Sequence, residues 1–468
     1  MEILGKKTKV LVVGLDCAGP ELIFEKFRDE LPNLSMMVDE GVYGRLESCH
    51  PPITIPAWAV MFTGKSPGRL GLYGFRHRKG NSYTDFYIAT SNFVREPTVW
   101  DLASKNGIRS CVVSVPPSYP PKPLNGNLIS CFITPDTAKE YTYPSNLKYE
   151  VEKLIGKYVF DVEFRTEKRK RLLKELYDMT EKRFKVLNYL IAKKPWNLFI
   201  FVEIGVDRVH HAFWKFFDRE HHKYVAGNEF EDVIPNYYKF IDEKVGELIK
   251  LAGEDTVVMV VSDHGVKRMK GAFCVNEWLA EEGLLKFKHK PENVVDLEKA
   301  PVDWTETRVW GWGGYYARIF LNVKGREAYG KIPKENYESF REEVADKLKT
   351  ITDPEGRRMD MRVFKPEEVY PVLNGDPPDL MVYFDNLYWR SAGTAGHKTI
   401  YLAENDKGPD DAMHAMHGTF ILYDKNGRFT GGKVEGLKIF DVAPTILNLL
   451  GLQKLEDMEG KVIVGLED

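Results

Sequence analysis

The chain has 468 residues, of which 43% are hydrophobic, and its 66 basic and 69 acidic side chains give a net charge of −3. This composition is typical of a soluble globular protein with ample apolar residues for a core. The near-balance of charge excludes the strongly basic surface used for stable nucleic-acid binding or for attachment to acidic membranes.

No apolar stretch is long enough to span a bilayer, and the segment before residue 16 resembles a strand more than a leader peptide. The five cysteines are odd in number and include no C-x-x-C pair, which favours reduced thiols over a disulfide framework. We therefore expect a cytoplasmic protein.

In chain order, short β-branched runs alternate with helical patterns. Amphipathic helices are predicted for the segments 165–193 and 236–252. The near-continuous apolar character of the runs is typical of parallel strands covered on both faces. The pattern predicts an α/β fold, a three-layer α/β/α sandwich around a mostly parallel sheet. Its buried strands are expected at 9–16, 108–116, 197–207, 256–265 and 418–424.

Residues 276–375 differ from the rest, because a polar loop-like stretch, an aromatic and glycine-rich stretch and a charged helix follow one another there. We interpret this segment as an insertion that caps the sheet and contributes to the substrate pocket. The catalytic core would then consist of residues 1–275 and 376–468, closed by a helix over 437–452 that ends at Gly451.

Potential metal ligands follow three of the predicted strands. Asp16 ends the first, Asp207 the third, and Asp263 with His264 the fourth. Ligands of open parallel sheets bind beyond the carboxyl ends of the strands, so these side chains can converge at one edge. His211 follows Asp207 at the i,i+4 spacing of one helical face.

Each of these residues also has an ordinary structural interpretation. Asp16 could cap a turn, Asp207 and His211 could form a solvated helix pair, and His414 or His417 could be structural histidines before a strand. Their joint occurrence at one predicted edge favours a metal site over a set of separate structural roles.

Thr54 lies in the unusual stretch HPPITIPAW, directly before an apolar helical run. It could be a plain N-cap, with Pro56 in the first helical turn. It could instead be a nucleophile that metal ions activate, with the helix N-terminus helping to bind a phosphate. Both roles require the same geometry, so we expect Thr54 to cap the helix and, from that position, to face the predicted metal site. The aromatic WGWGGYYAR segment could stack on a substrate or pack internally. Within the predicted insertion, Arg308, Trp310 and Tyr315 are candidate contacts for the leaving group of the substrate.

With these residues assembled, the sequence resembles the alkaline phosphatase superfamily, and within it the type I phosphodiesterase/nucleotide pyrophosphatase branch. The resemblance covers nearly the whole chain in collinear order. It is carried by the stretches VVGLDCAGPEL, PPITIPAWAVMFTGKSPGRLGLYGF, VDRVHHAFWKFFD, VSDHG, HAMHGTFIL and DVAPTILNLLGL.

The resemblance implies two divalent metal ions, zinc or alternatively manganese, with Thr54 as the nucleophile. One ion would be held by Asp16, Thr54, Asp263 and His264. The other would be held by Asp207, His211 and a late histidine, for which His414 matches the family spacing better than His417 does.

The expected function is hydrolysis of a small phosphate ester, of phosphodiester or nucleotide type, through a phosphothreonine intermediate. Threonine at the nucleophile position points away from phosphoglycerate mutases of the superfamily. A phosphomutase remains the alternative within the same fold, and a non-catalytic metal- or nucleotide-binding protein the alternative outside catalysis. The sequence predicts neither the exact substrate nor the oligomeric state.

Overall fold

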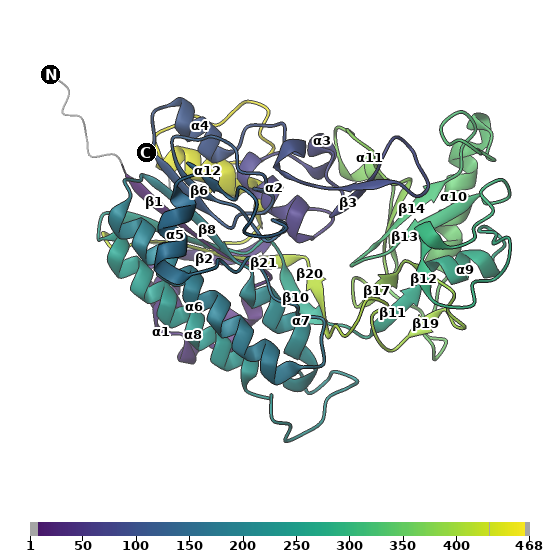
Figure 1. The fold of residues 1–468 in the computed structure, drawn as a ribbon, viewed down its shortest axis with the longest axis horizontal. Helices are drawn as coiled ribbons and strands as arrows, with labels where there is room; N and C mark the ends of the chain where they lie inside the picture. Colours follow the sequence, from purple (N-terminus) through teal and green to yellow (C-terminus); the bar gives the residue numbers. More distant parts are fainter. Residues whose placement is uncertain (1–7, 430, 464–468) are drawn as a thin grey trace.

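A computed structural model describes residues 8–429 and 431–463, and a large twisted sheet forms the centre of its larger lobe (Figure 1). The sheet has ten strands, and β23 (Leu437–Lys438) joins it by pairing with β2. In spatial order the other strands are β22 (Gly432–Lys433), β2 (Val42–Glu47), β21 (His417–Asp424), β9 (Thr256–Val261), β1 (Lys9–Leu15), β8 (Leu198–Glu203), β5 (Ser110–Val113), β6 (Gly126–Ile129) and β7 (Thr142–Tyr143).

The central strands β9, β1, β8, β5 and β6 are parallel, as the continuous apolar runs predict. Strand β21 differs, because it runs antiparallel to both β9 and β2. The sequence placed 418–424 among the parallel strands, and this orientation was wrong. A fully buried antiparallel strand has the same apolar composition as a parallel one, so composition cannot reveal its direction.

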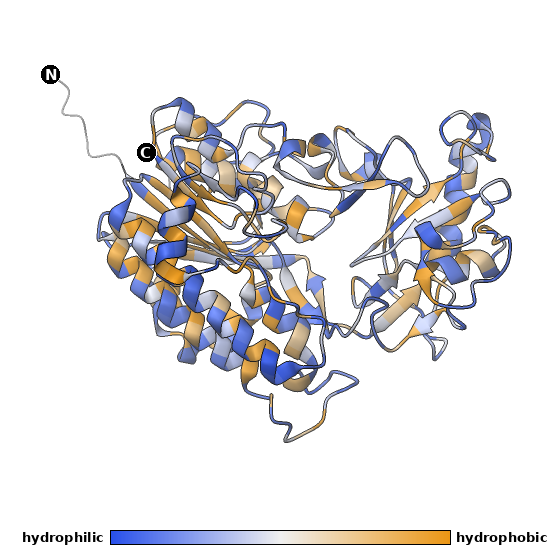
Figure 2. Cartoon of the chain, viewed as in Figure 1, coloured by the Kyte–Doolittle hydropathy of each residue, from blue (hydrophilic) through white to orange (hydrophobic). Residues whose placement is uncertain are grey.

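Helices cover both faces of the sheet, which confirms the three-layer α/β/α architecture. Apolar strands lie between amphipathic helices whose polar faces point outward (Figure 2). One face carries α1 (Pro32–Glu40), α5 (Leu147–Ile155), α6 (Arg169–Lys193), α7 (Gly205–Phe217) and α8 (Val233–Ala252), and the other carries α2 (Thr54–Thr63), α4 (Val99–Lys105) and α12 (Val442–Leu449).

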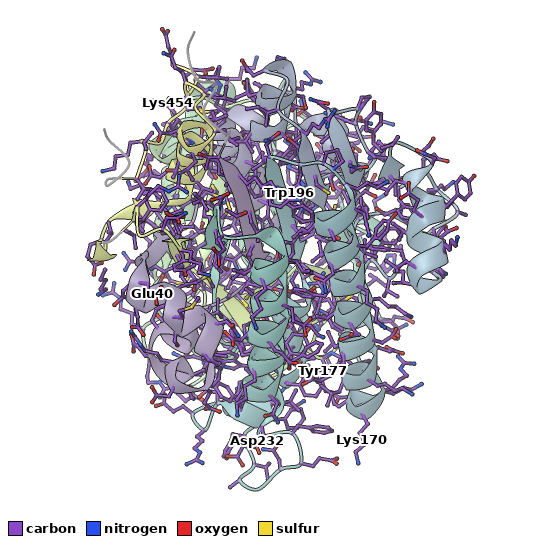
Figure 3. All side chains as sticks on the ribbon, turned by 90° about the vertical axis from the view of Figure 1, so that its left-hand side faces the viewer. Glu40, Lys170, Tyr177, Trp196, Asp232 and Lys454 are labelled. Atoms are coloured by element: carbon purple, nitrogen blue, oxygen red, sulfur yellow. The ribbon has the colours of Figure 1, made fainter. Side chains whose placement is uncertain are left out.

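The two long helices of the first face agree with the predicted helical segments. Helices α6 and α8 lie side by side in Figure 3, where Lys170 and Asp232 mark their beginnings at the same end. The rings of Tyr177 and Tyr237 meet between them, with centroids 5.3 Å apart. None of the helices in the described ranges is both long and apolar enough to cross a membrane.

Two predicted boundaries were wrong. The closing helix expected over 437–452 begins only at Val442, because Leu437–Lys438 form β23 by pairing with β2. The strand expected at 197–207 ends at Glu203, and helix α7 begins at Gly205. A Cβ at Gly205 would lie 2.0 Å from the hydroxyl of Tyr237 and 2.7 Å from a carboxylate oxygen of Glu203, so any larger residue would displace these two buried side chains. Asp207 and His211 therefore both belong to the helix.

A smaller lobe, on the right of Figure 1, contains several short sheets and helices. It has its own apolar core, which includes Trp310, Phe320 and Leu380. Its strands run from β11 to β19, over residues 271–402, whereas the insertion predicted over 276–375 is shorter; that domain division stays a prediction. The elements are β11 (Gly271–Cys274), α9 (Val275–Glu281), β12 (Val295–Asp296), β13 (Val309–Trp312), β14 (Ala317–Leu321), α10 (Tyr337–Lys349), β15 (Arg362–Phe364), α11 (Pro366–Val369), β16 (Leu380–Tyr383), β17 (Trp389–Ala392), β18 (Thr394–Ala395) and β19 (Tyr401–Leu402).

Gly14 of β1 is required where α2 packs closely on the sheet. A Cβ there would lie 2.7 Å from the carbonyl oxygen of Phe201 and 2.8 Å from the ring of Trp58. We expect Gly14→Ala to lower the free energy of unfolding by about 1–3 kcal/mol, measured by denaturant titration. Gly19→Ala is the matched control, since its Cβ would have no neighbour nearer than 3.4 Å, and an equal loss in both variants would refute the packing argument.

Candidate active site

The sheet order brings three acidic residues to one edge. Strands β9, β1 and β8 are neighbours, and each is followed at its carboxyl end by part of the site. Asp16 follows β1, Asp263 and His264 follow β9, and Asp207 lies in the first turn of α7 after β8. All four side chains are buried.

The first cluster consists of Asp16, Asp263 and His264. His264 Nε2 lies 3.1 Å from Asp263 Oδ2 and 3.9 Å from Asp16 Oδ1. The three ligand atoms are near enough to one another to share one metal ion. This is the group that the resemblance assigns to one ion, apart from Thr54.

The second cluster gathers around Asp207. His211 Nε2 lies 3.2 Å from Asp207 Oδ1 and 3.3 Å from His414 Nε2, and His414 Nε2 lies 3.8 Å from the same Asp207 oxygen. Asp207 and His414 also form a group with His264, so the two clusters adjoin.

His414, and not His417, is the late histidine that reaches the cluster. It lies on β20 (Ala412–Ala415), which pairs with β10 (Gly265–Arg268) directly after His264. Its Nδ1 donates to the carbonyl oxygen of Pro52 at 2.8 Å, which leaves Nε2 facing Asp207. His417 is exposed at the start of β21. His210 points away and stacks on Tyr238.

Thr54 is the first residue of α2, and Ile53, with extended backbone angles, occupies the N-cap position. The expectation that Thr54 itself caps the helix was wrong by one position, and its side chain makes no capping hydrogen bond. Its hydroxyl is not engaged in a hydrogen bond with any residue in the described ranges. Thr54 instead lines a cavity beside the two clusters.

Trp58 connects the helix of Thr54 to the first cluster. One turn after Thr54, its Nε1 donates to Asp16 Oδ2 at 2.6 Å. This bond holds the carboxylate so that its other oxygen, Oδ1, stays free. The sequence TIPAW thus contains both the cavity hydroxyl and the residue that orients a candidate ligand.

Several ligand-type atoms of the site are buried without hydrogen-bond partners. They are Asp16 Oδ1, Asp207 Oδ1, Asp263 Oδ2 and His264 Nε2. Buried polar atoms are rarely left unpaired, because each costs free energy. Oxygen and imidazole nitrogen atoms in this arrangement suit a divalent cation such as zinc or manganese, so the donor set fits metal binding.

The electrostatics of the site agree with that fit. Burial, together with the nearby Asp263 and Asp207 carboxylates, raises the pKa of Asp16 well above its usual value. Burial and the neighbouring His264 and His211 hold the pKa of His414 well below its usual value. The carboxylates therefore repel one another, and the neutral form of His414 is the one that binds a cation. Although burial opposes the shift, Asp410 and Asp207 raise the pKa of His211 well above its usual value, so a cation bound there would displace a proton from His211.

Sequence reasoning missed Asp410, which supports His211. Its Oδ1 lies 2.6 Å from His211 Nδ1, so Nε2 is left to face Asp207. Although burial opposes the shift, His211 and Arg165 keep the pKa of Asp410 below its usual value. The acidic pair DD four residues before His414 was the available signal. Cys17, assigned only as a reduced thiol, also lies beside Asp207 and His211.

The cavity next to Thr54 has a volume of about 240 Å³ and lies between the two lobes. Tyr315 lines it and stacks on His414, with ring centroids 3.7 Å apart. The other two candidate contacts lie elsewhere, since Trp310 is buried in the smaller lobe and Arg308 covers the ring of Phe340. Five arginines that the sequence did not single out line the cavity: Arg76, Arg165, Arg208, Arg318 and Arg390.

The fold is that of an α/β protein in which buried Asp and His side chains meet at the carboxyl ends of parallel strands, beside a cavity that Thr54 lines. This arrangement suits phosphoryl chemistry. Comparison with known proteins agrees. The model of the type I phosphodiesterase/nucleotide pyrophosphatase family matches residues 10–419, and the chain belongs to this family.

Solved structures of that family share the fold. Human ectonucleotide pyrophosphatase/phosphodiesterase 5 superimposes with a TM-score of 0.58 at 14% identity, over 96% of both chains. The murine counterpart, an inactive threonine-to-alanine variant in complex with AMP, gives a TM-score of 0.57 at 14% identity, again over 96% of both chains. No match is found among curated proteins.

Removing the Trp58 hydrogen bond should weaken metal binding by the first cluster, while an aromatic replacement keeps most of the packing of the core. We expect Trp58→Phe to lower zinc affinity and kcat/KM by about 10–100-fold, because Asp16 loses the donor that orients it. Zinc titration and phosphodiester kinetics measure the two effects. Trp100→Phe, which alters the same aromatic face without touching Asp16, is the control, and equal losses in both variants would count against the orienting role.

Proposed function

We propose that the protein is a metal-dependent hydrolase of phosphodiester or nucleotide-type substrates and that Thr54 is its nucleophile. The observation that carries the proposal is the unbonded Thr54 hydroxyl at a cavity wall beside three buried carboxylates with unpaired oxygens. Family membership supports the reaction class. The odd number of cysteines supports a reducing, cytoplasmic setting.

In this proposal Asp16, Thr54, Asp263 and His264 hold one divalent ion. Asp207, His211 and His414 hold the other. When bound, such ions supply Lewis-acid stabilisation of phosphoryl charge and favour deprotonation of a hydroxyl ligand. Zinc suits the histidine and carboxylate donors best, and manganese is the second choice.

The residues themselves perform the remaining tasks. Thr54 loses its hydroxyl proton and its Oγ1 attacks phosphorus, forming the Oγ1–P bond as the P–O bond to the leaving group breaks and the leaving oxygen takes up a proton. Water then attacks phosphorus, the Oγ1–P bond breaks, and one proton of the water returns to Oγ1 to regenerate the threonine. Asp410 keeps His211 in its orientation throughout, and Arg208 does the same for Asp207 through a close ion pair.

A phosphomutase would use the same first step and then return the phosphoryl group to another hydroxyl of the substrate. The arginine-lined cavity is the observation that favours this second candidate, because it could retain an anionic product. A non-catalytic binding protein would need no free nucleophile, and the unbonded Thr54 argues against it.

The test is a substrate panel containing a phosphodiester, a phosphomonoester and a sulfate ester, each assayed with added zinc or manganese. Preferred cleavage of the diester supports the proposal. Isomerised product without release of an alcohol would support the mutase, and binding of AMP without turnover of any substrate would support the binding protein.

A further inference from the structure

The cavity beside Thr54 has an unusual charge. Among the described residues that line it there are five arginines and no aspartate or glutamate. Thr54 and Ile53 form its wall on the larger lobe. Arg318 of β14 and Arg390 of β17 reach it from the smaller lobe.

Three of the five arginines pair with a carboxylate at 3.2 Å or less. Arg208 pairs with Asp161 at 2.7 Å and also with Asp207. Arg165 pairs with Asp410 at 2.9 Å. The third, Arg76, has Glu298 at 3.2 Å. These three charges are therefore already neutralised within the protein.

Arg390 is different. Its residue is 6% exposed, and its Nε and Nη1 atoms are buried without a hydrogen-bond partner. Its nearest carboxylate oxygen, Asp410 Oδ2, lies 3.5 Å away and already accepts two hydrogen bonds from Arg165. The guanidinium is held 4.6 Å from the centroid of the Tyr315 ring, at the cavity.

Arg318 is also 6% exposed, and no carboxylate in the described ranges lies within ion-pair distance of it. Its Nη1 donates to the backbone carbonyl of Arg76, and its guanidinium lies 5.0 Å from the Trp312 ring centroid. Burial, with Arg76 close by, lowers the pKa of Arg318. The protein thus stabilises this charge poorly by itself.

Backbone contacts of the smaller lobe position Arg390. Backbone hydrogen bonds of 2.9 and 3.0 Å join Gly314 and Ser391 in both directions. A Cβ at Gly313 would lie 2.3 Å from the nitrogen of Gly393, so the two segments approach as closely as glycine permits. This contact sets Arg390 beside Tyr315 and keeps the pair in the cavity wall.

Beyond Arg390 the excess of positive charge ends. An adjoining cavity of about 210 Å³ shares Arg76 and Arg390 and adds Lys407, but three acidic residues, Asp296, Glu298 and Asp406, balance these charges. The region that favours an anion is therefore confined to the space between Thr54 and the two arginines. Burying a cation with a weak ion pair, as for Arg390, or with none, as for Arg318, is costly. A ligand oxyanion there would offset that cost through charge-assisted hydrogen bonds.

We propose that Arg318 and Arg390 bind a second oxyanion group of the substrate, a phosphate or a carboxylate, on the part that extends from Thr54 into the smaller lobe. This inference rests on the proposed function, because it takes the scissile phosphate to lie at Thr54. It narrows the substrate class to phosphate esters with a second anionic group. The arginines are specificity-determining residues in this account.

Binding of non-hydrolysable phosphonates to the zinc-loaded full-length chain tests the proposal. The ligands are propylphosphonate, 3-phosphonopropionate and 1,3-propanediphosphonate, which differ in whether the far end is neutral, a carboxylate or a phosphonate. By calorimetry we expect at least one of the two ligands with a second anionic group to bind at least about tenfold more tightly than propylphosphonate. The tighter of the two identifies the preferred oxyanion.

The variants Arg318→Met and Arg390→Met should each reduce this ratio of affinities to near one, and Arg390→Lys should restore part of it. Arg308→Met, an exposed arginine of the same lobe outside the cavity, should leave the ratio unchanged. Thermal unfolding of each variant checks the fold, and the two arginines give independent tests. Equal affinity for all three ligands, or a ratio that survives both Met variants, would overturn the proposal.

The assay requires no turnover, so it separates this inference from the proposed function. If a ligand with a second anionic group binds about tenfold more tightly than propylphosphonate but the protein has no phosphodiesterase activity, the anion site is supported and the proposed function is contradicted. If the protein cleaves a diester but binds all three ligands equally, the proposed function is supported and the anion site is contradicted.

Discussion

Thr54→Ala is expected to lower kcat/KM for a phosphodiester by at least about 10³-fold, because the variant lacks the atom that forms the bond to phosphorus. The hydroxyl lines the cavity and is free of other hydrogen bonds among the described residues, so it has no evident structural task there. Steady-state kinetics with added zinc measure the loss. Bound zinc should remain, because Asp16, Asp263 and His264 are intact.

Two variants control this result. Thr54→Ser keeps a hydroxyl and should retain activity within about tenfold of the wild type. Thr63→Ala alters the other end of the same helix, where the hydroxyl donates to the carbonyl oxygen of Ala59 and accepts from the N–H of Lys65, and it should have little effect on turnover. Full activity of Thr54→Ala would rule out the nucleophile assignment.

Asp16→Asn is expected to stabilise the metal-free protein by about 1–3 kcal/mol while abolishing activity. Burial and the Asp263 and Asp207 carboxylates disfavour the Asp16 charge, and asparagine removes that charge. Its side-chain oxygen can still accept the hydrogen bond from Trp58. Denaturant titration after chelation measures the change.

With metal bound, the wild type should become more stable than Asp16→Asn. Zinc at about 100-fold excess over its dissociation constant would stabilise the wild type by about 2.7 kcal/mol, and the Asp16→Asn protein much less. Asp242→Asn is the contrasting control, because both oxygens of Asp242 accept backbone hydrogen bonds at the start of α1 and the variant should lose stability without metal. Destabilisation of metal-free Asp16→Asn would show that the carboxylates do not repel one another as described.

Much of the fold follows from local patterns in the chain. The apolar runs predicted β1, β5, β8, β9 and β21, because buried strands need apolar residues on both faces. The direction of β21 was missed, since direction depends on the connection and not on composition. The start of α7 was missed because Gly205 is required by its tertiary neighbours, Tyr237 and Glu203.

Some residues of the candidate site could be predicted from the sequence, and others could not. Asp16, Asp263 and His264 could be predicted because parallel strands place their carboxyl ends at one edge. Arg318 and Arg390 could not, because each lies singly on a strand of the smaller lobe, and their common cavity arises only when the two lobes fold together. Asp410 contacts His211 and acts through it. The DD pair that contains Asp410 is visible in the sequence, but its spacing does not show that it supports a histidine 199 residues earlier in the chain.

The stereochemical course at phosphorus tests the central claim most directly. A p-nitrophenyl phosphorothioate ester of a nucleoside, chiral at phosphorus, would be hydrolysed in ¹⁸O-labelled water with zinc present. Two in-line displacements, first by Thr54 and then by water, predict net retention of configuration. Net inversion would mean that water attacks the substrate directly, and it would contradict Thr54 as the nucleophile.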